Sequence, residues 1–208
     1  MKINILANGC EENFLPPAKE GDIGYDIRAK SVEIVGDETE EGSGLYRSID
    51  YIEYDTGVVL EPALFSEIHQ SLGLGEGVEV VTIPEEEFFT LCLPRSGVSG
   101  YNLQLCNSVG VIDIGYRGTL RARYNYIFQP EDYRLTPITN EKAGVKGFFS
   151  QATFSYAVLG VVNPDKIFKV GDKVIQAVFA RAFWPETEVV DQASGTERGS
   201  DGFNSTGR

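Results

Sequence analysis

Hydrophobic residues recur along the chain in short runs rich in β-branched and aromatic side chains, separated by glycine and charged residues. Runs of this length and composition are typical of β-strands, and the segments between them are typical of turns. The pattern therefore predicts an all-β fold, either a sandwich or a jelly roll. The expected strands lie within Lys2–Leu6, Tyr25–Val35, Tyr51–Leu60, Val78–Ile83, Phe88–Leu93, Leu120–Phe128, Ala152–Val162 and Lys173–Phe183.

Two segments depart from the strand pattern. The stretch Gly36–Gly44 combines glycines with acidic residues, a composition that predicts a solvated loop. The stretch Pro62–Leu72 has apolar residues at helical intervals and predicts a short surface helix. The residues that set this interval are Ala63, Leu64, Ile68 and Leu72.

Length and cysteine usage indicate one reduced, intracellular domain. A chain of 208 residues is expected to fold as a single domain, 1–208, and to bury about 70% of its unfolded surface. The three cysteines Cys10, Cys92 and Cys106 are far apart and form no CxxC pair. No apolar run is long enough to form a signal peptide or a membrane span. We therefore expect a cytoplasmic protein whose mature chain is the whole chain.

Charge and histidine content narrow the function classes. The formal net charge of −13 argues against a general binder of nucleic acid or of anionic membranes, because both partners require a basic face. The single histidine, His69, excludes a multi-histidine metal cage and leaves at most one side chain for triad chemistry. Carboxylates, hydroxyls and arginines are therefore the expected chemical groups.

Five short segments carry polar or small residues within or beside the expected strands. In PRSGVS, Arg95 supplies a fork of donors, Ser96 a hydroxyl, and Gly97 a backbone that an anion can approach. The segment Arg198–Gly207 offers backbone N–H groups and hydroxyls that suit phosphate oxygens. The alternative is a disordered tail. The segments are GYDIRA (Gly24–Ala29), PRSGVS (Pro94–Ser99), NSVGVIDIGYRG (Asn107–Gly118), GDKVIQAVF (Gly171–Phe179) and RGSDGFNSTG (Arg198–Gly207).

The third segment places a carboxylate close to an aromatic ring. Asp113 follows the apolar run Val109–Ile112 and precedes Tyr116 by three residues. A tight hairpin with this spacing would direct both side chains into one pocket. The alternative is a turn aspartate that is hydrogen-bonded to its own backbone.

Taken together and in this order, the five segments resemble the five motifs of the trimeric dUTP diphosphatase (dUTPase) family. The resemblance spans nearly the whole chain, from Gly24 to Gly207. It implies a jelly-roll (dUTPase-like β-clip) fold and a homotrimer whose three active sites combine motifs from different subunits. It also implies hydrolysis of dUTP to dUMP and pyrophosphate with Mg²⁺.

The resemblance assigns the nucleoside and the attacking water to the third segment. Asp113 would be the general base for the water that attacks the α-phosphorus. Tyr116 would pack under the deoxyribose and exclude a 2′-hydroxyl. The amide of Asn107 would read the uracil edge, because an amide offers both a donor and an acceptor. The hairpin backbone at Gly110 and Ile112 would complete this readout.

The other four segments would hold the phosphates and the metal. Asp26 would help to place hydrated Mg²⁺, which also offsets the repulsion between an anionic nucleotide and an acidic protein. Phe203 would stack on the uracil when the C-terminal arm closes. The remaining phosphate-binding residues would be Arg95, Ser96, Gly97 and Gln176, with Arg198 at the γ-phosphate and Ser205 and Thr206 at the terminal phosphates. Asp201 departs from the glycine that is frequent in the last motif.

Two insertions and a flexible C-terminal arm are expected in addition to the five motifs. We expect insertions near residues 36–54 and 130–156 and a flexible C-terminal arm over residues 195–208. The second insertion is rich in aromatic residues and is expected to form an extra β-arm or to bind a second protein. An arm that covers the subunit's own surface is the alternative.

Two other functions stay open. A related dCTP deaminase has an Ile-Asp-x-Gly-aromatic pattern like Ile112–Tyr116, but deamination requires a glutamate where this chain has Arg123, which cannot accept a proton. A nucleotide-gated binding protein on the same scaffold is the second alternative. The sequence leaves a phage or a bacterium open as the source, with action in the host cell if the source is a phage.

Overall fold

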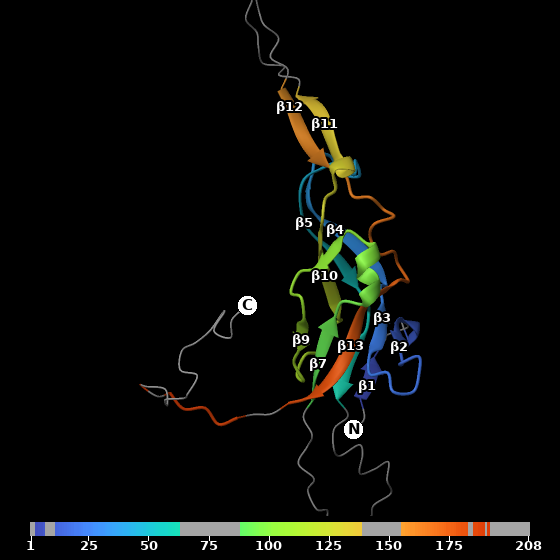
Figure 1. The fold of residues 1–208 in the computed structure, drawn as a ribbon, viewed down its shortest axis with the longest axis vertical. Helices are drawn as coiled ribbons and strands as arrows, with labels where there is room; N and C mark the ends of the chain where they lie inside the picture. The colour runs from blue at the N-terminus through green and yellow to red at the C-terminus, as the bar shows by residue number, and fades with distance from the viewer. Residues whose placement is uncertain are drawn as a thin grey trace, which may run out of the picture.

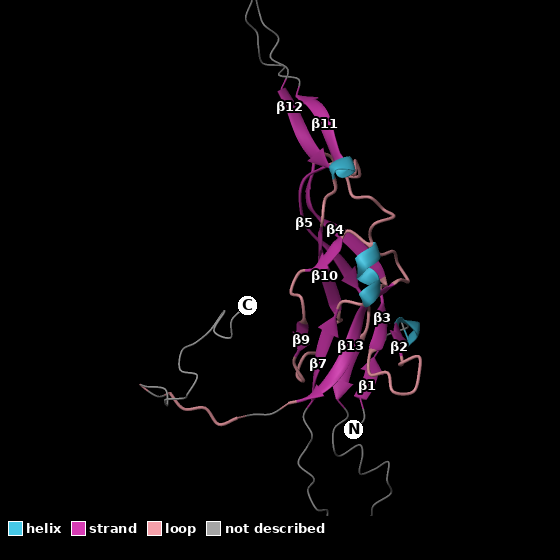
Figure 2. Cartoon of the chain, in the orientation of Figure 1, coloured by secondary structure: helices cyan, strands magenta, loops and turns pink. Residues whose placement is uncertain are grey.

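The computed structural model describes residues 3–6, 11–62, 88–138, 155–182, 185–189 and 191. Its regular structure is almost entirely β, with short 3-10 turns as the helical elements, so the all-β prediction is confirmed (Figure 2). The strands are β1 (Ile3–Leu6), β2 (Phe14–Leu15), β3 (Tyr25–Arg28), β4 (Ser31–Glu38), β5 (Tyr46–Asp55), β6 (Val59–Pro62), β7 (Phe88–Leu93), β8 (Leu103–Leu105), β9 (Gly110–Ile112), β10 (Arg121–Tyr126), β11 (Tyr133–Ile138), β12 (Ser155–Gly160) and β13 (Lys173–Arg181). The 3-10 helices are η1 (Glu11–Asn13), η2 (Ser96–Gly100) and η3 (Pro130–Asp132).

The strands form two main antiparallel sheets. The first has the order β2-β3-β13-β7-β9, and the second has the order β11-β12-β5-β10-β8 with β4 also paired to β5 (Figure 1). Strands β1 and β6 form a separate pair. One core cluster contains buried side chains from both sheets, because each sheet turns one apolar face inward. Its most buried members include Ile27, Ile52, Tyr54, Tyr124, Val174, Ile175 and Ala177.

Aromatic side chains connect the two sheets directly. The hydroxyl of Tyr124 on β10 donates to the carbonyl of Val174 on β13 over 2.6 Å. The Phe168 ring packs edge-on against Tyr54 and Tyr124, with centroid distances of 5.9 and 5.7 Å. Burial raises the pKa of Tyr124 above its ordinary value, so this hydroxyl remains a donor. The two sheets are thereby joined by a polar contact as well as by apolar packing.

The five-stranded sheet pairs the first motif with the fourth and places the start of the second motif, just after Leu93, beside them. Strand β13 lies between β3 and β7, and its Gln176 pairs with Asp26 on one side and with Leu93 on the other. The pairing with β3 contains a register irregularity between Lys173 and Ile175. Val174 and Ile175 are consequently both buried, which a regular alternating strand would not allow.

The segment expected as an acidic loop is partly strand. Strand β4 continues through Glu38 and pairs with β5, so the turn is shorter than Gly36–Gly44. The Glu38 carboxylate accepts the N–H groups of Gly42 and Gly44 at 3.1 and 2.6 Å. Gly42 and Gly44 both have positive φ, a conformation that favours glycine. The expected loop is therefore a wrong assignment for its first three residues, because cross-strand pairing outweighs their polar composition.

The expected helix does not begin at Pro62. This residue ends strand β6 and pairs with Ile3 of β1. The rest of Pro62–Leu72 lies outside the described residues, as does the expected strand Val78–Ile83. In the part of the chain that the structure describes, no helix is long and apolar enough to cross a membrane. Cys92 is buried and Cys106 is exposed, and both are free thiols.

The described ends of the segment 130–156, where we expect an insertion, contribute to a β-arm made of β11 and β12. Strands β11 and β12 pair from Tyr133–Gly160 to Ile138–Ser155, and β12 meets β5 through Gly160 and Tyr46. At the base of the arm, the buried Asp132 carboxylate accepts the Tyr126 hydroxyl at 2.9 Å. Strands β11 and β12 belong to the second sheet, but they project away from its other strands instead of covering them (Figure 1).

Candidate active site

A carboxylate held by two cations marks one end of the five-stranded sheet. Asp26 on β3 accepts the Nε of Arg95 at 2.6 Å and the Nζ of Lys173 at 2.8 Å. Arg95 lies just after β7 and Lys173 begins β13, so three neighbouring strands contribute one residue each. The side chain of Asp26 is 18% exposed, whereas those of Arg95 and Lys173 are 32% and 35% exposed. The cations therefore remain accessible to an anion from solution.

The ion pairs determine the protonation state of Asp26. Burial acts to raise the pKa of this carboxyl, but hydrogen bonds and charge interactions with Lys173 and Arg95 outweigh burial and lower it below the ordinary value of 3.8. Asp26 is consequently ionised at neutral pH. Two cations around one carboxylate leave a local excess of positive charge in a chain whose net charge is −13.

Gln176 lies beside this cluster because the position facing it is glycine. A Cβ atom at Gly24 would come within 1.6 Å of the Gln176 Nε2 atom. The amide therefore lies directly against the backbone of the first motif. The predicted phosphate-binding residues Arg95 and Gln176 and the predicted metal residue Asp26 thus share one end of the sheet.

The second motif leads into helix η2. Ser96 and Gly97 are both exposed, and the space in front of Gly97 is open, since a Cβ atom there would meet nothing within 4 Å beyond its chain neighbours. The Ser96 carbonyl accepts the Ser99 hydroxyl at 3.0 Å, which holds the turn closed. This surface allows a ligand to approach the backbone at Gly97 closely.

The third motif is not a hairpin within one sheet. Among the described strands, β8 pairs with β10 and β9 pairs with β7, so the chain crosses from one main sheet to the other between Leu105 and Gly110. The hairpin expected around Asp113 and Tyr116 is also wrong, because β9 before these residues pairs with β7 and β10 after them pairs with β5 and β8. Asn107 nevertheless lies close to the buried Gly110. A Cβ atom at Gly110 would lie 3.2 Å from the Asn107 Nδ2 atom.

Asp113 follows β9 and is exposed. Its backbone carbonyl accepts the Tyr116 N–H at 3.0 Å, which closes a tight turn. Among the described residues, no group hydrogen-bonds to its carboxylate. The alternative of a turn aspartate bonded to its own backbone therefore does not hold for this side chain. Ile112, on the strand before it, pairs with Thr90 of β7.

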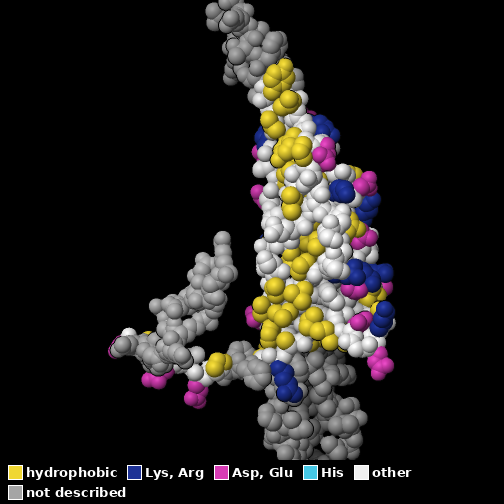
Figure 3. All heavy atoms as spheres, viewed as in Figure 1, with side chains coloured by type: hydrophobic (Ala, Val, Ile, Leu, Met, Phe, Trp, Pro, Cys, Tyr) yellow, Lys and Arg dark blue, Asp and Glu magenta, His cyan; other side chains and the backbone are white. Residues whose placement is uncertain are grey.

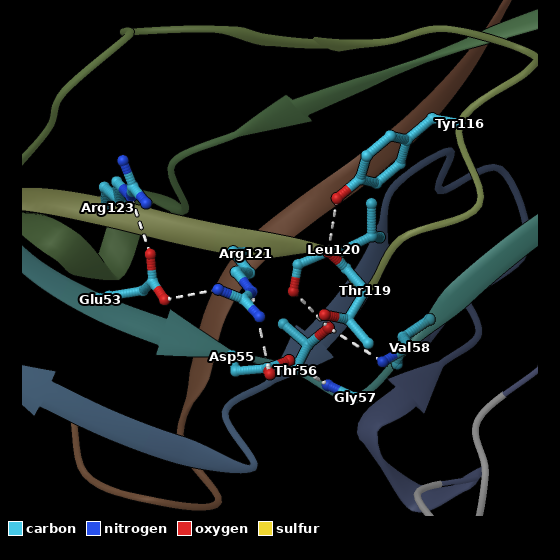
Figure 4. Close-up of polar contacts among 10 residues, drawn as sticks. All are labelled: Glu53, Asp55, Thr56, Gly57, Val58, Tyr116, Thr119, Leu120, Arg121 and Arg123. Atoms are coloured by element: carbon cyan, nitrogen blue, oxygen red, sulfur yellow. Dashed lines mark hydrogen bonds and ion pairs between the residues drawn. The ribbon is translucent and has the colours of Figure 1, made fainter.

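Tyr116 lies folded over its own loop (Figure 4). Its hydroxyl donates to the Thr119 carbonyl at 3.1 Å, and a Cβ atom at Gly118 would come within 2.4 Å of that hydroxyl. Glycine at position 118 is therefore required for this ring position. With 45% of its surface exposed, the ring remains available to a ligand.

The loop that carries Asp113 and Tyr116 is anchored where it enters β10. The carbonyl of Leu120 accepts hydrogen bonds from the backbone N–H of Thr56 at 3.1 Å and from the Thr56 hydroxyl at 2.8 Å. The backbone N–H of Leu120 donates to the carbonyl of Val58 at 2.8 Å. Figure 4 shows these contacts below Tyr116. Thr56 is completely buried, so the loop ends at a rigid point.

Asp113 and the ion pairs of Asp26 lie at different ends of the sheet. Ile112 pairs with Thr90 and Gly110 pairs with Cys92, so Asp113 lies one position past Thr90 along β7, away from Arg95. At about 3.3 Å per residue, the two side chains are separated by roughly 15–20 Å. In Figure 1, β9 lies at the left edge beside β7, and the green turn of η2 lies higher in the view and to the right. One chain therefore does not bring Asp113 to its own cluster.

Arg123 has a structural partner. Its Nε atom donates to Glu53 at 2.8 Å (Figure 4). Its guanidinium lies 4.3 Å from the centre of the Tyr51 ring. The hydrogen bond to Glu53 raises the pKa of Arg123, so the side chain cannot accept a proton. Arg123, which stands where a deaminase needs a glutamate, thus forms an ion pair with Glu53.

The described residues do not form a ready-made metal centre. Among the described residues, no group of three or more His, Cys, Asp or Glu side chains could hold one. Each Asp26 oxygen already accepts a hydrogen bond, but a carboxylate has about four lone-pair sites and can also accept a bound water. This fits Mg²⁺ that retains its waters and binds mainly to phosphates, with Asp26 in contact through water.

Four predicted residues lie outside the described part of the chain, together with the C-terminal arm 195–208. These residues are Arg198, Phe203, Ser205 and Thr206. Sequence reasoning missed Lys173, although it lies in the fourth segment. Regular alternation from Gln176 would place Lys173 on the opposite face, and only the bulge beside Ile175 brings both to one face.

The Asp26 ion pairs predict a pH dependence of stability in the metal-free protein. A carboxyl with a lowered folded pKa stabilises the fold above its unfolded pKa, and this contribution disappears as the pH falls through the folded value. Asp26→Asn should therefore lower the free energy of unfolding at pH 7, and the difference from wild type should shrink below about pH 4.

Urea denaturation between pH 3 and pH 7 measures this difference. Asp37→Asn is the matched control, because its ion pair with Arg47 is more than half exposed and should contribute little. A difference between Asp26→Asn and wild type that stays constant over the whole range would contradict the prediction.

Comparison with known proteins identifies relatives of the chain. It is 30% identical over 157 residues to the deoxyuridine 5'-triphosphate nucleotidohydrolase of Desulfitobacterium hafniense, covering 73% of this chain and 80% of the relative. It is 31% identical over 128 residues to the mitochondrial enzyme of that name from Dictyostelium discoideum, covering 61% and 51%. No family model matches the chain.

Solved structures share the fold. A Staphylococcus bacteriophage 80alpha dUTPase with dUPNHPP superposes with a TM-score of 0.57 at 20% identity, covering 100% of this chain and 99% of that one. A dUTPase from phage phi11 of S. aureus, with a structural Mg(II) ion, gives 0.51 at 20% identity over 92% and 98%. The jelly-roll prediction is confirmed. With the sequence relatives, this shows that the chain belongs to the deoxyuridine 5'-triphosphate nucleotidohydrolase (dUTPase) family.

Proposed function

We propose that the chain hydrolyses dUTP to dUMP and pyrophosphate by attack of water on the α-phosphorus, in the cytoplasm. The observation that carries this proposal is the exposed Asp113 carboxylate, which has no hydrogen-bond partner among the described residues. A carboxylate in this state can orient and deprotonate a water molecule without histidine. The relatives named as nucleotidohydrolases support the same reaction.

The third motif would recognise the nucleoside. Asn107 and the backbone at Gly110 and Ile112 would bind the uracil edge, because the amide lies against Gly110. The accessible ring of Tyr116 would pack against the deoxyribose and leave no space for a 2′-hydroxyl. These contacts would select a deoxyuridine nucleotide over UTP.

The other motifs would hold the phosphate chain. Arg95, Ser96, Gly97 and Gln176 would donate to phosphate oxygens, and Asp26 would contact hydrated Mg²⁺. The metal would offset part of the phosphate charge when bound. From the C-terminal arm, Arg198, Ser205 and Thr206 would add further phosphate contacts, and Phe203 would stack on the uracil.

The active site would be shared between subunits of a homotrimer. Asp113 and the Arg95 cluster are too far apart in one chain to act on the same phosphorus, because a general base must lie within hydrogen-bond reach of the attacking water. A second copy that contributes Asp113 removes this difficulty.

Substitution of the proposed base tests the reaction. Asp113→Asn should lower kcat by about 10²–10⁴-fold, because an amide cannot accept the proton of the attacking water. Pyrophosphate and ammonia release should be measured with dUTP, dCTP, UTP and dTTP, with and without Mg²⁺. The wild type should release pyrophosphate from dUTP alone, and Asp165→Asn, an exposed aspartate paired with Lys169, should match it. Ammonia from dCTP would instead establish a deaminase.

Mixed oligomers test the shared site. Co-expression of Asp113→Asn with the double variant Arg95→Ala, Gln176→Ala should restore about a quarter of the wild-type activity, because random mixing completes that share of sites between chains. Each variant alone should be nearly inactive. Light scattering should give three times the mass of the chain. Absence of any restored activity in verified mixed oligomers would mean that each site lies within one chain.

We also propose that the β11–β12 arm binds a second protein in a nucleotide-dependent manner. Leu135, Tyr156 and Val158 lie on one face of the arm and are 70%, 55% and 59% exposed. Figure 3 shows hydrophobic side chains along the arm and the adjoining body. Exposed apolar faces of this kind favour protein contacts. The 80alpha relative is one of the phage dUTPases described as controlling transfer of virulence genes by a proto-oncogenic G protein-like mechanism.

Replacement of the arm face tests this second function. The triple variant Leu135→Thr, Tyr156→Thr, Val158→Thr keeps strand-forming residues but removes apolar surface. It should hydrolyse dUTP like the wild type and fail to retain proteins that the wild type binds in the presence of dUPNHPP. Arg134→Gln, elsewhere on β11, is the control. Equal retention by the triple variant would exclude the face as the binding surface, and loss of oligomeric mass would assign it to self-assembly.

A further inference from the structure

Two cations lie at the proposed phosphate end of the sheet, Arg28 in the first motif and Lys173 in the fourth, and the family resemblance assigned a role to neither. Ile27 is completely buried, so Asp26 and Arg28, the residues on either side of it along β3, face away from the core. Arg28 pairs in register with Lys173 on β13. Arg28, Lys173 and Arg95 therefore surround one end of the same sheet, and we call these three residues the cation cluster.

The cation cluster has more positive charge than its partners neutralise. Among the described residues, Asp26 is the carboxylate that forms ion pairs with Arg95 and Lys173, and Arg28 forms none. Three cations and one carboxylate leave a charge of about +2 where the rest of the chain is strongly acidic. Like charges gathered in a partly buried position are unfavourable without a counter-ion. The arrangement is therefore incomplete without an anion.

Arg28 supplies an independent sign of a missing ligand. Its Nε atom is buried and has no hydrogen-bond partner among the described residues. A buried donor without an acceptor is unfavourable, whereas a phosphate oxygen is a strong acceptor for a guanidinium. The residue itself is only partly buried, so part of its surface remains open to solvent.

We propose that Arg28 and Lys173 join Arg95 in a three-cation subsite that positions the phosphate chain of the substrate. This inference rests on the proposed function, because it takes the polyphosphate of dUTP as the anion. The Lys173 Nζ and the Arg28 guanidinium donate to phosphate oxygens, and Asp26 keeps Lys173 and Arg95 in place before the substrate arrives. Arg28 and Lys173 would position the substrate, since neither residue transfers a proton in the reaction.

Binding measurements separate this role from a purely structural one. Arg28→Met and Lys173→Met should each weaken the binding of non-hydrolysable dUPNHPP roughly 10-fold or more, because each removes charge-assisted hydrogen bonds. Binding of deoxyuridine, which has no phosphate, should not change. The KM for dUTP should rise by a similar factor. Lys169→Met is the matched control, because Lys169 pairs with the exposed Asp165.

Conservative variants keep the test decisive if a methionine variant fails to fold. Lys173→Arg and Arg28→Lys retain the charge and should recover most of the affinity for dUPNHPP. Wild-type affinity in folded Arg28→Met and Lys173→Met would overturn the inference, even if the wild type hydrolyses dUTP. Weakened dUPNHPP binding in both, with a wild type that binds the analogue but does not hydrolyse dUTP, would support the subsite and contradict the proposed reaction.

Discussion

The position of β13 between β3 and β7 is the constraint on which the proposed phosphate-binding side of the site depends. Because Gln176 pairs with Asp26 on one strand and with Leu93 on the other, motifs far apart in the sequence meet in one row. The pairing also fixes the start of η2, since Arg95 follows Leu93 by two residues. The ion pairs of Asp26 then only refine an arrangement that backbone hydrogen bonds have already set.

The same sheet separates the proposed base from the phosphate side. Strand β9 lies at the edge beyond β7 and runs antiparallel to it, so each residue after Gly110 moves further from Arg95. Asp113 therefore lies away from its own cluster while its loop is held firmly at Thr56 and Leu120. Assembly would supply the missing half of the site, which makes catalysis depend on contact between copies.

Local patterns in the sequence located β1, β7, β10, β12 and β13, but they missed β2, β8, β9 and β11 and the exceptions to alternation. Strand β10 alternates exposed Arg121 and Arg123 with buried Ala122 and Tyr124, as its composition predicts. Lys173 could not be assigned from the sequence, because the bulge that turns it toward Asp26 arises from pairing with β3. The separation of β8 from β9 was equally hidden, since sheet membership depends on distant partners.

The charge distribution unites these observations. A chain with a net charge of −13 repels a nucleoside triphosphate at long range, so binding needs a local field of the opposite sign. Asp26 allows two cations to lie close together without a ligand, since its carboxylate offsets their mutual repulsion. Its low pKa keeps this offset in place at neutral pH. One partly buried carboxylate thus makes a cationic site possible on an acidic protein.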